Sequence, residues 1–309
     1  MKDGVLLINK PSGFTSFDVI AKLRGILKEK KLGHGGTLDP NVTGVLPVFI
    51  GKATKAIDMV SRQEKRYTAT FRLGIKTDTQ DIWGEILEEN APERDIDKIK
   101  DAVFSFKGES MQLPPMYSAI RVNGVRLYDL AREGKEIERA ARKINVYDIT
   151  FEGKAEGENE YKFSLLCSKG TYVRTICADI GEKLGCGAAM TSLVRTQSMG
   201  FELKNCFTLD EVQKAADEGR VDELVRPIEE IFSDLPPIFL NEKNTHLYKN
   251  GVGLDPKRVS GLIYDSGYEI AVNQRYCVFG CDMAFIGIGY IDYTKREFRT
   301  LKMFYNEEK

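Results

Sequence analysis

The stretch GHGGTLDPNVTG, residues 33–44, sets an aspartate in a short loop that is restricted on both sides. Gly35 and Gly36 allow backbone angles that other residues rarely adopt. Pro40 fixes its own backbone and disfavours helix at Asp39, the residue before it. The chain therefore holds one short carboxylate on a tight, preset turn. Two interpretations are open: Asp39 reacts with a substrate, or it only bonds its own backbone in an Asp-Pro turn.

Outward from this loop, strands and helices mix without a regular β-α-β repeat. Residues 4–10 predict a first strand, and residues 15–27 predict a helix with Ser16 as its N-cap and Gly33 as its stop signal. Residues 65–74 alternate between apolar and polar side chains, which predicts a half-buried strand. This mixture favours the α+β class over a parallel doubly wound sheet.

DLPPIFL, residues 234–240, marks the predicted domain boundary. Two adjacent prolines cannot continue a helix, and short β-rich runs dominate from residue 260: YEIAV, RYCVFG, AFIGIGYID and REFRTLKMFY. We therefore expect a large domain over residues 1–235 and a small barrel-like β domain over residues 236–309.

The net charge is −1, from 45 Lys and Arg against 46 Asp and Glu, which by itself does not favour a nucleic-acid binder. The basic residues are nevertheless concentrated. One group, within residues 22–31, leads into the aspartate loop, and a second group occupies residues 121–143. Such a distribution lets one face attract phosphate, although a solvated helix face explains it equally well.

The sequence carries no motif for a metal or an organic cofactor. The six cysteines form no C-x-x-C pair, and His34 and His246 are the two histidines, which is too few ligands for a structural zinc site. Neither a Walker loop nor a G-x-G-x-x-G segment opens a helix. Apolar runs such as residues 45–50 are too short to cross a bilayer, and the N-terminus lacks a secretory apolar region. We expect no cofactor, no metal, no membrane span and a cytoplasmic protein.

Four further residues are candidates by type and placement. Tyr67 either stacks on a planar ring or packs as an ordinary strand aromatic. Arg174 lies at the start of a predicted helix, where the helix dipole gives a cation no benefit, so it requires an anionic partner. His34 is open to three interpretations: a general base, a stacking group or a structural loop residue. Leu193 fits an ordinary core position.

Five segments occur in an order that makes the pattern specific: GHGGTLDPNVTGVLPVFIGKATK, EKRYTATFRLG, TDTQDIWG, QLPPMYSAIRVNGVRLYDLAREG and CSKGTYVRTICADIGEKLGCGA. Together they closely resemble the bacterial tRNA pseudouridine-55 synthase family, the TruB type, over most of residues 1–232. The later stretch AFIGIGYID resembles the small PUA RNA-binding module that usually follows in this family.

The resemblance implies a pseudouridine synthase fold, with a mixed, largely antiparallel central sheet flanked by helices and loops, and a PUA-type C-terminal domain. It implies isomerisation of uridine 55 in the T-loop of tRNA, by base flipping, cleavage of the N-glycosidic bond and formation of a C–C bond. Among the catalytic residues, it places the nucleophile on Asp39, the stacking tyrosine on Tyr67 and the carboxylate-paired arginine on Arg174.

The resemblance also implies three substrate-binding residues. His34 would stack in the RNA when the target base leaves, Tyr172 would be a second pocket tyrosine, and Leu193 would form an apolar wall. The basic insertion at about 110–143 would clamp the RNA. The implied partner is the T-arm of tRNA, without a guide RNA or an obligatory protein partner, and we expect a monomer.

Two alternatives remain. A non-catalytic tRNA-binding chaperone explains the basic groups but not the matching set of Asp39, Tyr67 and Arg174. A guide-RNA-dependent relative works inside a particle, and the short segment before the first motif strand favours the stand-alone form. The motifs present one carboxylate beside an arginine in an expected dry pocket, which suits rearrangement better than hydrolysis.

Overall fold

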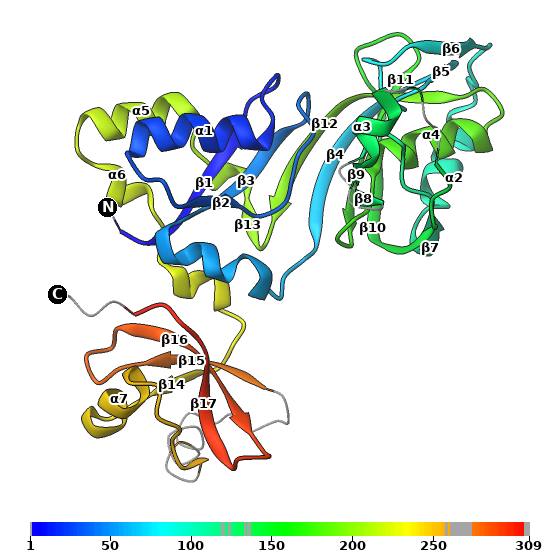
Figure 1. Cartoon of the computed structure of the whole chain (residues 1–309). Coiled ribbons are helices and arrows are strands. Elements are labelled where there is room, and N and C mark those ends of the chain that lie inside the picture. Colours follow the sequence, from blue (N-terminus) through cyan, green and yellow to red (C-terminus); the bar gives the residue numbers. More distant parts are fainter. Residues whose placement is uncertain are drawn as a thin grey trace.

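The structure is a computed structural model that describes residues 2–118, 121–122, 125–132, 134, 137–256, 259 and 274–305. Its larger part is built on one sheet whose strands are, in spatial order, β1 (Gly4–Lys10), β3 (Thr43–Ile50), β12 (Ala188–Ser198), β4 (Lys65–Leu73), β11 (Glu160–Cys167), β10 (Arg142–Lys154) and β7 (Gly108–Gln112). Strand β2 (Leu32–His34) pairs with β3, and β13 (Phe201–Glu202) pairs with β12. Among these described pairs only β3 and β12 run parallel. The predicted α+β class with a mixed, largely antiparallel sheet is confirmed (Figure 1).

The remaining elements of the larger part are short. Two hairpins are formed by β5 (Ile75–Thr77) with β6 (Ile86–Glu89) and by β8 (Arg121–Val122) with β9 (Val125–Arg126). The α-helices are α1 (Ser16–Leu27), α2 (Ile96–Phe104), α3 (Leu127–Arg132), α4 (Val173–Lys183), α5 (Leu209–Asp217) and α6 (Val221–Leu224). The 3-10 helices are η1 (Gly51–Met59), η2 (Leu203–Asn205) and η3 (Ile228–Phe232). Among the described helices none is both long and apolar enough to span a membrane.

Both faces of the sheet are covered, and the strand sequences show it. Leu6 and Ile8 of β1 pack into a cluster with α1 and α5, whereas Val5 and Leu7 pack into a cluster on the opposite face. Successive side chains of a strand point to opposite faces, so a strand that is apolar throughout is buried on both. Strand β4 buries Tyr67 and its alternate neighbours in a third cluster with α2 and α4, as the period predicted.

The small C-terminal part is a four-stranded sheet in the order β14 (Pro237–Phe239), β15 (Arg275–Phe279), β16 (Phe285–Asp292) and β17 (Glu297–Met303), with α7 (Glu242–Lys249) against it. Three of the predicted β-rich runs are therefore strands, and the fourth, YEIAV at 268–272, lies outside the described residues. Cys277, Ile288 and Phe304 of this part join one apolar cluster with Val5, Leu7 and Phe49 of the larger part. The two parts thus share a packed core.

The start and stop of α1 differ from the sequence prediction. Thr15, not Ser16, is the N-cap, and it forms a capping box with Asp18. The buried Ser16 hydroxyl instead accepts a hydrogen bond from the backbone N–H of Leu38 at 2.9 Å. The helix ends at Leu27, because the next residue adopts a left-handed conformation well before the predicted stop at Gly33. The misassigned serine therefore anchors the aspartate loop to the helix.

Candidate active site

Asp39 lies between β2 and β3, and a buried lysine holds the backbone beside it. The side chain of Lys10 is 0% exposed at the end of β1. Its Nζ donates hydrogen bonds to the carbonyl oxygens of Pro11, Phe14 and Pro40, the last at 2.8 Å. An ammonium has three donors, and all three are used here. Burial lowers the pKa of Lys10 to about 8, with the charge of Asp39 opposing this shift.

A buried arginine holds the other side of the loop. Arg195 of β12 is 0% exposed, and its Nε donates to the carbonyl of Val45 at 2.8 Å. Its Nη1 and Nη2 donate to the carbonyls of Thr37 and Gly36 at 3.3 and 3.1 Å. Because a guanidinium is a rigid planar fork, these bonds fix the direction as well as the position of the loop. The loop is held from β1, α1 and β12 together.

The glycines of the loop serve two different purposes. Gly36 has a φ of 97° and Gly44 a φ of 106°, so both occupy the region that favours glycine. At Gly44 a Cβ would also lie 2.2 Å from the carbonyl oxygen of Arg195. Gly35 has no positive φ; a Cβ there would lie 2.5 Å from the Met199 sulfur and 3.0 Å from a Phe49 ring carbon, so these side chains would have to shift.

The side chain of Arg174 reaches Asp39 from the first turn of α4. Its Nη1 lies 3.5 Å from Oδ2 of Asp39 and 3.6 Å from Oδ2 of Asp81. Its Nη2 donates to the carbonyl of Tyr117. The sequence motifs predicted one carboxylate beside this arginine, and Asp81, from the segment TDTQDIWG, is a second. The sequence patterns did not reveal Asp81, because it is far from Arg174 in the sequence and only the fold brings the two side chains together.

Gln112 fixes the beginning of α4. Tyr172 is the N-cap of this helix but makes no side-chain capping bond. Instead, the buried Gln112 accepts a hydrogen bond from the Tyr172 N–H at 2.8 Å and donates to the Tyr172 carbonyl at 3.0 Å. Unpaired N–H groups at a helix start are normally capped by a side chain, and here that side chain comes from β7. Gln112 therefore sets the helix turn that carries Arg174.

These elements enclose a cavity of about 180 Å³. Its lining includes five of the six predicted site residues: Asp39, Tyr67, Tyr172, Arg174 and Leu193. The other lining residues are Thr37, Leu38, Val42, Lys65, Gly170, Thr171, Val173 and Met190. With about 30 Å³ per water molecule, the space corresponds to about six waters, enough for a small planar group. The cavity combines one carboxylate, one guanidinium, two tyrosine rings and an apolar wall.

His34 is the predicted site residue that does not line this cavity. It ends β2, is partly buried, and its Nδ1 has no hydrogen-bond partner. Burial lowers the pKa of His34, and the charge of Arg195 lowers it further. The imidazole is therefore biased toward its neutral form near the loop.

Two titratable side chains of β4 face the cavity. Burial raises the pKa of the Tyr67 phenol, with the charge of Arg195 opposing this shift, so the hydroxyl stays protonated. Burial lowers the pKa of Lys65 to about 8, and the charge of Arg195 lowers it further. Lys65 was not identified from the sequence, although it stands in the quoted segment EKRYTATFRLG.

The cavity is less enclosed than the dry pocket expected from the sequence. The Asp39 side chain is 49% exposed, whereas that of Arg174 is 6% exposed. The described part of the chain therefore leaves the carboxylate accessible from solvent.

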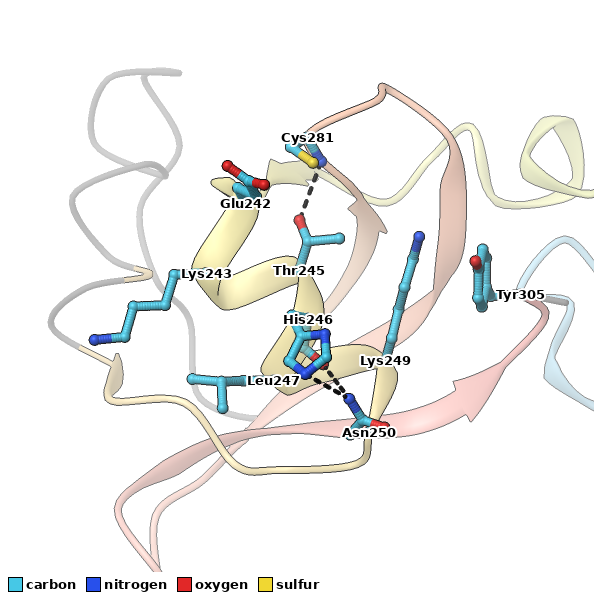
Figure 2. Close-up of a pocket in the computed structure, with 9 residues that line it drawn as sticks. All are labelled: Glu242, Lys243, Thr245, His246, Leu247, Lys249, Asn250, Cys281 and Tyr305. Atoms are coloured by element: carbon cyan, nitrogen blue, oxygen red, sulfur yellow. Dashed lines mark hydrogen bonds between the residues drawn. The ribbon is translucent and has the colours of Figure 1, made fainter. Parts of the chain in front are cut away.

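A larger hollow of about 640 Å³ lies in the small domain, between α7 and Tyr305 (Figure 2). Its lining contains lysines and one histidine but no arginine-paired carboxylate, so the smaller cavity is the candidate active site. Among the described residues no group of three His, Cys, Asp or Glu side chains is placed to hold a metal ion.

Comparison with known proteins gives consistent matches over the chain. Residues 24–173 match the family described as TruB family pseudouridylate synthase (N terminal domain). Residues 174–233 match the tRNA pseudouridylate synthase B C-terminal domain. The tRNA pseudouridine synthase B of Bacillus subtilis (strain 168) is 45% identical over 278 residues, covering 88% of this chain and 89% of the relative. The protein of the same name from Clostridium acetobutylicum is 42% identical over 308 residues, covering 97% and 99%.

Solved structures are similar in fold. A chain from the crystal structure of a Cbf5-Nop10-Gar1 complex has a TM-score of 0.68 and 24% identity, and the match covers 98% of this chain and 85% of that one. A chain of the archaeal box H/ACA sRNP Nop10-Cbf5 complex has a TM-score of 0.67 and 23% identity, with coverage of 99% and 87%. At these identities the likeness shows the fold alone, and it agrees with the pseudouridine synthase fold expected from the sequence.

Proposed function

The chain belongs to the TruB family of pseudouridylate synthases, and from this membership and the geometry of the site we propose that it isomerises uridine 55 in the T-loop of tRNA to pseudouridine. The relatives named tRNA pseudouridine synthase B support pseudouridine formation in tRNA. One observation carries the assignment of the site: a loop anchored by buried cations holds Asp39 beside Arg174, in a cavity lined by Tyr67.

The reaction rearranges one nucleotide without adding an atom. The bond from uracil N1 to the ribose breaks, a bond from uracil C5 to the same carbon forms, the C5 proton leaves and N1 gains a proton. A base inside a folded RNA loop must first be extruded to react. We propose that the ring of Tyr67 stacks on the extruded uracil and that Leu193 and Tyr172 bound the cavity around it.

Asp39 is the proposed nucleophile. A carboxylate can attack an electron-poor carbon of the sugar or of the ring, and the geometry is compatible with either. Arg174 orients this carboxylate while its own position is fixed by Asp81 and the Tyr117 carbonyl. Preset geometry of this kind lowers the barrier because the groups do not have to be ordered during the reaction.

Bound RNA completes the site in this proposal. The Asp39 side chain is half exposed in the protein alone, and we propose that the bound RNA loop covers it. His34 would fill the space left in the RNA when the base leaves, from its position beside the loop. The basic residues of 121–143 would clamp the RNA through phosphates, which position a substrate without reading its sequence. We propose that the protein acts alone, without a guide RNA or a protein partner.

The test is tritium release by the purified protein from a tRNA transcript labelled at uridine C5. Release from the T-loop position is expected, and it should vanish when uridine 55 alone is replaced by cytidine. Asp39→Asn should lower the rate by about 10⁴-fold or more while retaining RNA binding. A wild-type protein that binds tRNA but releases no tritium would favour the chaperone alternative. Release from another position would overturn the site assignment in the RNA.

A further inference from the structure

Four lysines gather where the segment after β3 meets the small domain: Lys31, Lys52, Lys55 and Lys302. We call them the interdomain lysine cluster. Lys52 and Lys55 lie on η1, and the Lys31 carbonyl accepts a hydrogen bond from the Gly51 N–H at 2.8 Å. Lys302 lies on β17. Burial lowers the pKa of Lys55, and the charges of the other three lysines lower it further, which places all four within electrostatic reach.

In the part of the chain that the structure describes, few negative charges neutralise this cluster. Among the described residues, none of the four ammonium groups forms an ion pair with a carboxylate. Lys52 donates from Nζ to the carbonyl of Tyr305, which carries no net charge. Asp3 is a nearby acid, and its Oδ1 accepts a hydrogen bond from the Lys52 backbone N–H at 3.0 Å. Since the whole chain has a net charge of −1, such a local excess of positive charge indicates an anionic partner.

The cluster lies far from Asp39 but is rigidly connected to it. Strand β3 begins a few residues after Asp39, and η1 follows its last residue. At about 3.3 Å per residue, the 8 residues of this strand span about 23 Å. Figure 1 shows the blue 51–59 segment between the central sheet and the small domain. At this separation nucleotides next to the target base do not reach the cluster, so an RNA contact there requires a remote part of the same folded RNA.

The positive surface continues into the small domain. Nζ of Lys249 lies 3.7 Å from the centre of the Tyr305 ring, whose carbonyl accepts the bond from Lys52. Figure 2 shows Lys249, His246 and Lys243 around the open hollow of this domain. In the hollow Asp282 lies 3.8 Å from Lys249, and Glu242 is a further acid of its lining, so the lysines there are partly neutralised.

We propose that the interdomain lysine cluster binds backbone phosphates in a helical part of the substrate tRNA that lies outside the T-arm stem–loop. The inference rests on the proposed function and identifies a second part of its substrate interface. Lysine ammonium groups act as point charges on phosphate and read no base, so the contact is independent of sequence. Binding there adds affinity for a complete tRNA but leaves the chemistry at Asp39 unchanged.

The experiment compares the triple variant Lys31→Gln, Lys55→Gln, Lys302→Gln with a control of equal charge, Lys100→Gln, Lys154→Gln, Lys214→Gln. Each is measured with an unmodified tRNA transcript and with an isolated T-arm stem–loop. For tRNA, the cluster variant should show a KM raised by about tenfold, an unchanged kcat, and a slope of log affinity against log salt that is shallower by about two to three. The stem–loop and the control variant should show none of these changes.

Measurements of tRNA affinity separate this proposal from the proposed function, because they do not depend on pseudouridine formation. If wild type forms no pseudouridine but the cluster variant still loses affinity for tRNA, the function fails and the phosphate surface stands. If the cluster variant matches wild type in affinity and salt slope on tRNA, the surface is wrong. Equal losses on tRNA and on the stem–loop would also overturn it, because the contact would then lie near the T-loop. Lys55→Gln alone provides a smaller change of the same kind should the triple variant fold poorly.

Discussion

Nη1 of the buried Arg174 lies 3.5 Å from Oδ2 of the half-exposed Asp39. The arginine is the fixed member of this pair, since it also contacts Asp81 and the Tyr117 carbonyl. The loop backbone on either side of Asp39 is held by Lys10, at Pro40, and by Arg195, at Gly36 and Thr37. Asp39 lines the cavity and stays half exposed, so one side of its carboxylate remains open.

Arg174→Lys should lower kcat by about 10- to 100-fold, which corresponds to losing about 1.5–3 kcal/mol of charge-assisted hydrogen bonding. A single ammonium cannot contact two carboxylates and a carbonyl in the geometry of a planar fork. Single-turnover tritium release at saturating protein measures the effect. The matched control is Arg220→Lys, an exposed arginine paired with Glu218 and Glu223. Wild-type rates in Arg174→Lys would show that only charge matters at this position.

Gly44→Ala should lower the free energy of unfolding by at least about 3 kcal/mol, because a Cβ there meets the backbone oxygen of Arg195 at 2.2 Å. Gly13→Ala is the control. Gly13 also has a positive φ, of 81°, but nothing lies within 4 Å of its Cβ, so only backbone strain of about 1 kcal/mol applies. Urea denaturation followed by circular dichroism measures both. Equal losses in the two variants would mean that the close contact at Gly44 relaxes without cost.

Gln112→Ala should lower stability by about 2 kcal/mol, since two buried hydrogen bonds to Tyr172 are lost and their backbone partners remain. It should also lower kcat, because the first turn of α4 carries Arg174. Gln213→Ala removes an exposed side-chain bond to Asp217 and should change neither quantity. A stable Gln112→Ala variant with full activity would contradict the capping role.

The affinity for tRNA should fall as the pH rises through about 8, the lowered pKa of Lys65 in the cavity wall. Deprotonation removes a positive charge from the surface that receives an anionic substrate. Lys10 has a pKa of about 8 as well and adds to the decline by loosening the loop at Pro40. KM measured between pH 6.5 and 9 checks this, and Lys65→Met should show a smaller pH dependence.

The free energy of unfolding should change with pH in the opposite direction from the affinity for tRNA, rising as Lys65 loses its proton. Its pKa is lowered in the folded state from 10.5 to about 8, so the unfolded chain binds more protons between these values. The stability of wild type relative to Lys65→Met should therefore rise across this window, by about 1–3 kcal/mol. Thermal unfolding of both proteins at matched pH values gives the difference. A falling difference would mean that the charged form is the one stabilised by folding.

Local sequence patterns predicted the strands and helices that carry the site residues, but not the buried polar side chains that hold those residues in place. The alternation around Tyr67 and the helix after Tyr172 follow from neighbouring residues, and the structure contains both. Lys10, Arg195 and Gln112 act through partners remote in the sequence, at Pro40, Gly36 and Tyr172 respectively. A polar residue that ends or interrupts an apolar strand, as Lys10 and Arg195 do, is the local signal that was available.

The assignment of Ser16 as the N-cap shows the same limit. Thr15 and Ser16 are both suitable caps, and local rules do not choose between them. The choice is made by packing, because Ser16 is needed to bond Leu38 while Thr15 pairs with Asp18. Asp81 and the exposure of Asp39 likewise depend on how distant segments meet.

The apolar cluster that joins Val5 and Phe49 to Ile288 and Phe304 fixes the position of the small domain relative to the large one. Swinging the small domain away would bring this surface into water, at about 25 cal/mol for each Å² exposed. The spacing between the reacting loop and the lysines on η1 and β17 is therefore set before any RNA arrives. Under the proposed function and the proposed phosphate contact, an RNA whose helical parts are lengthened or shortened should be a poorer substrate even when its T-loop is intact.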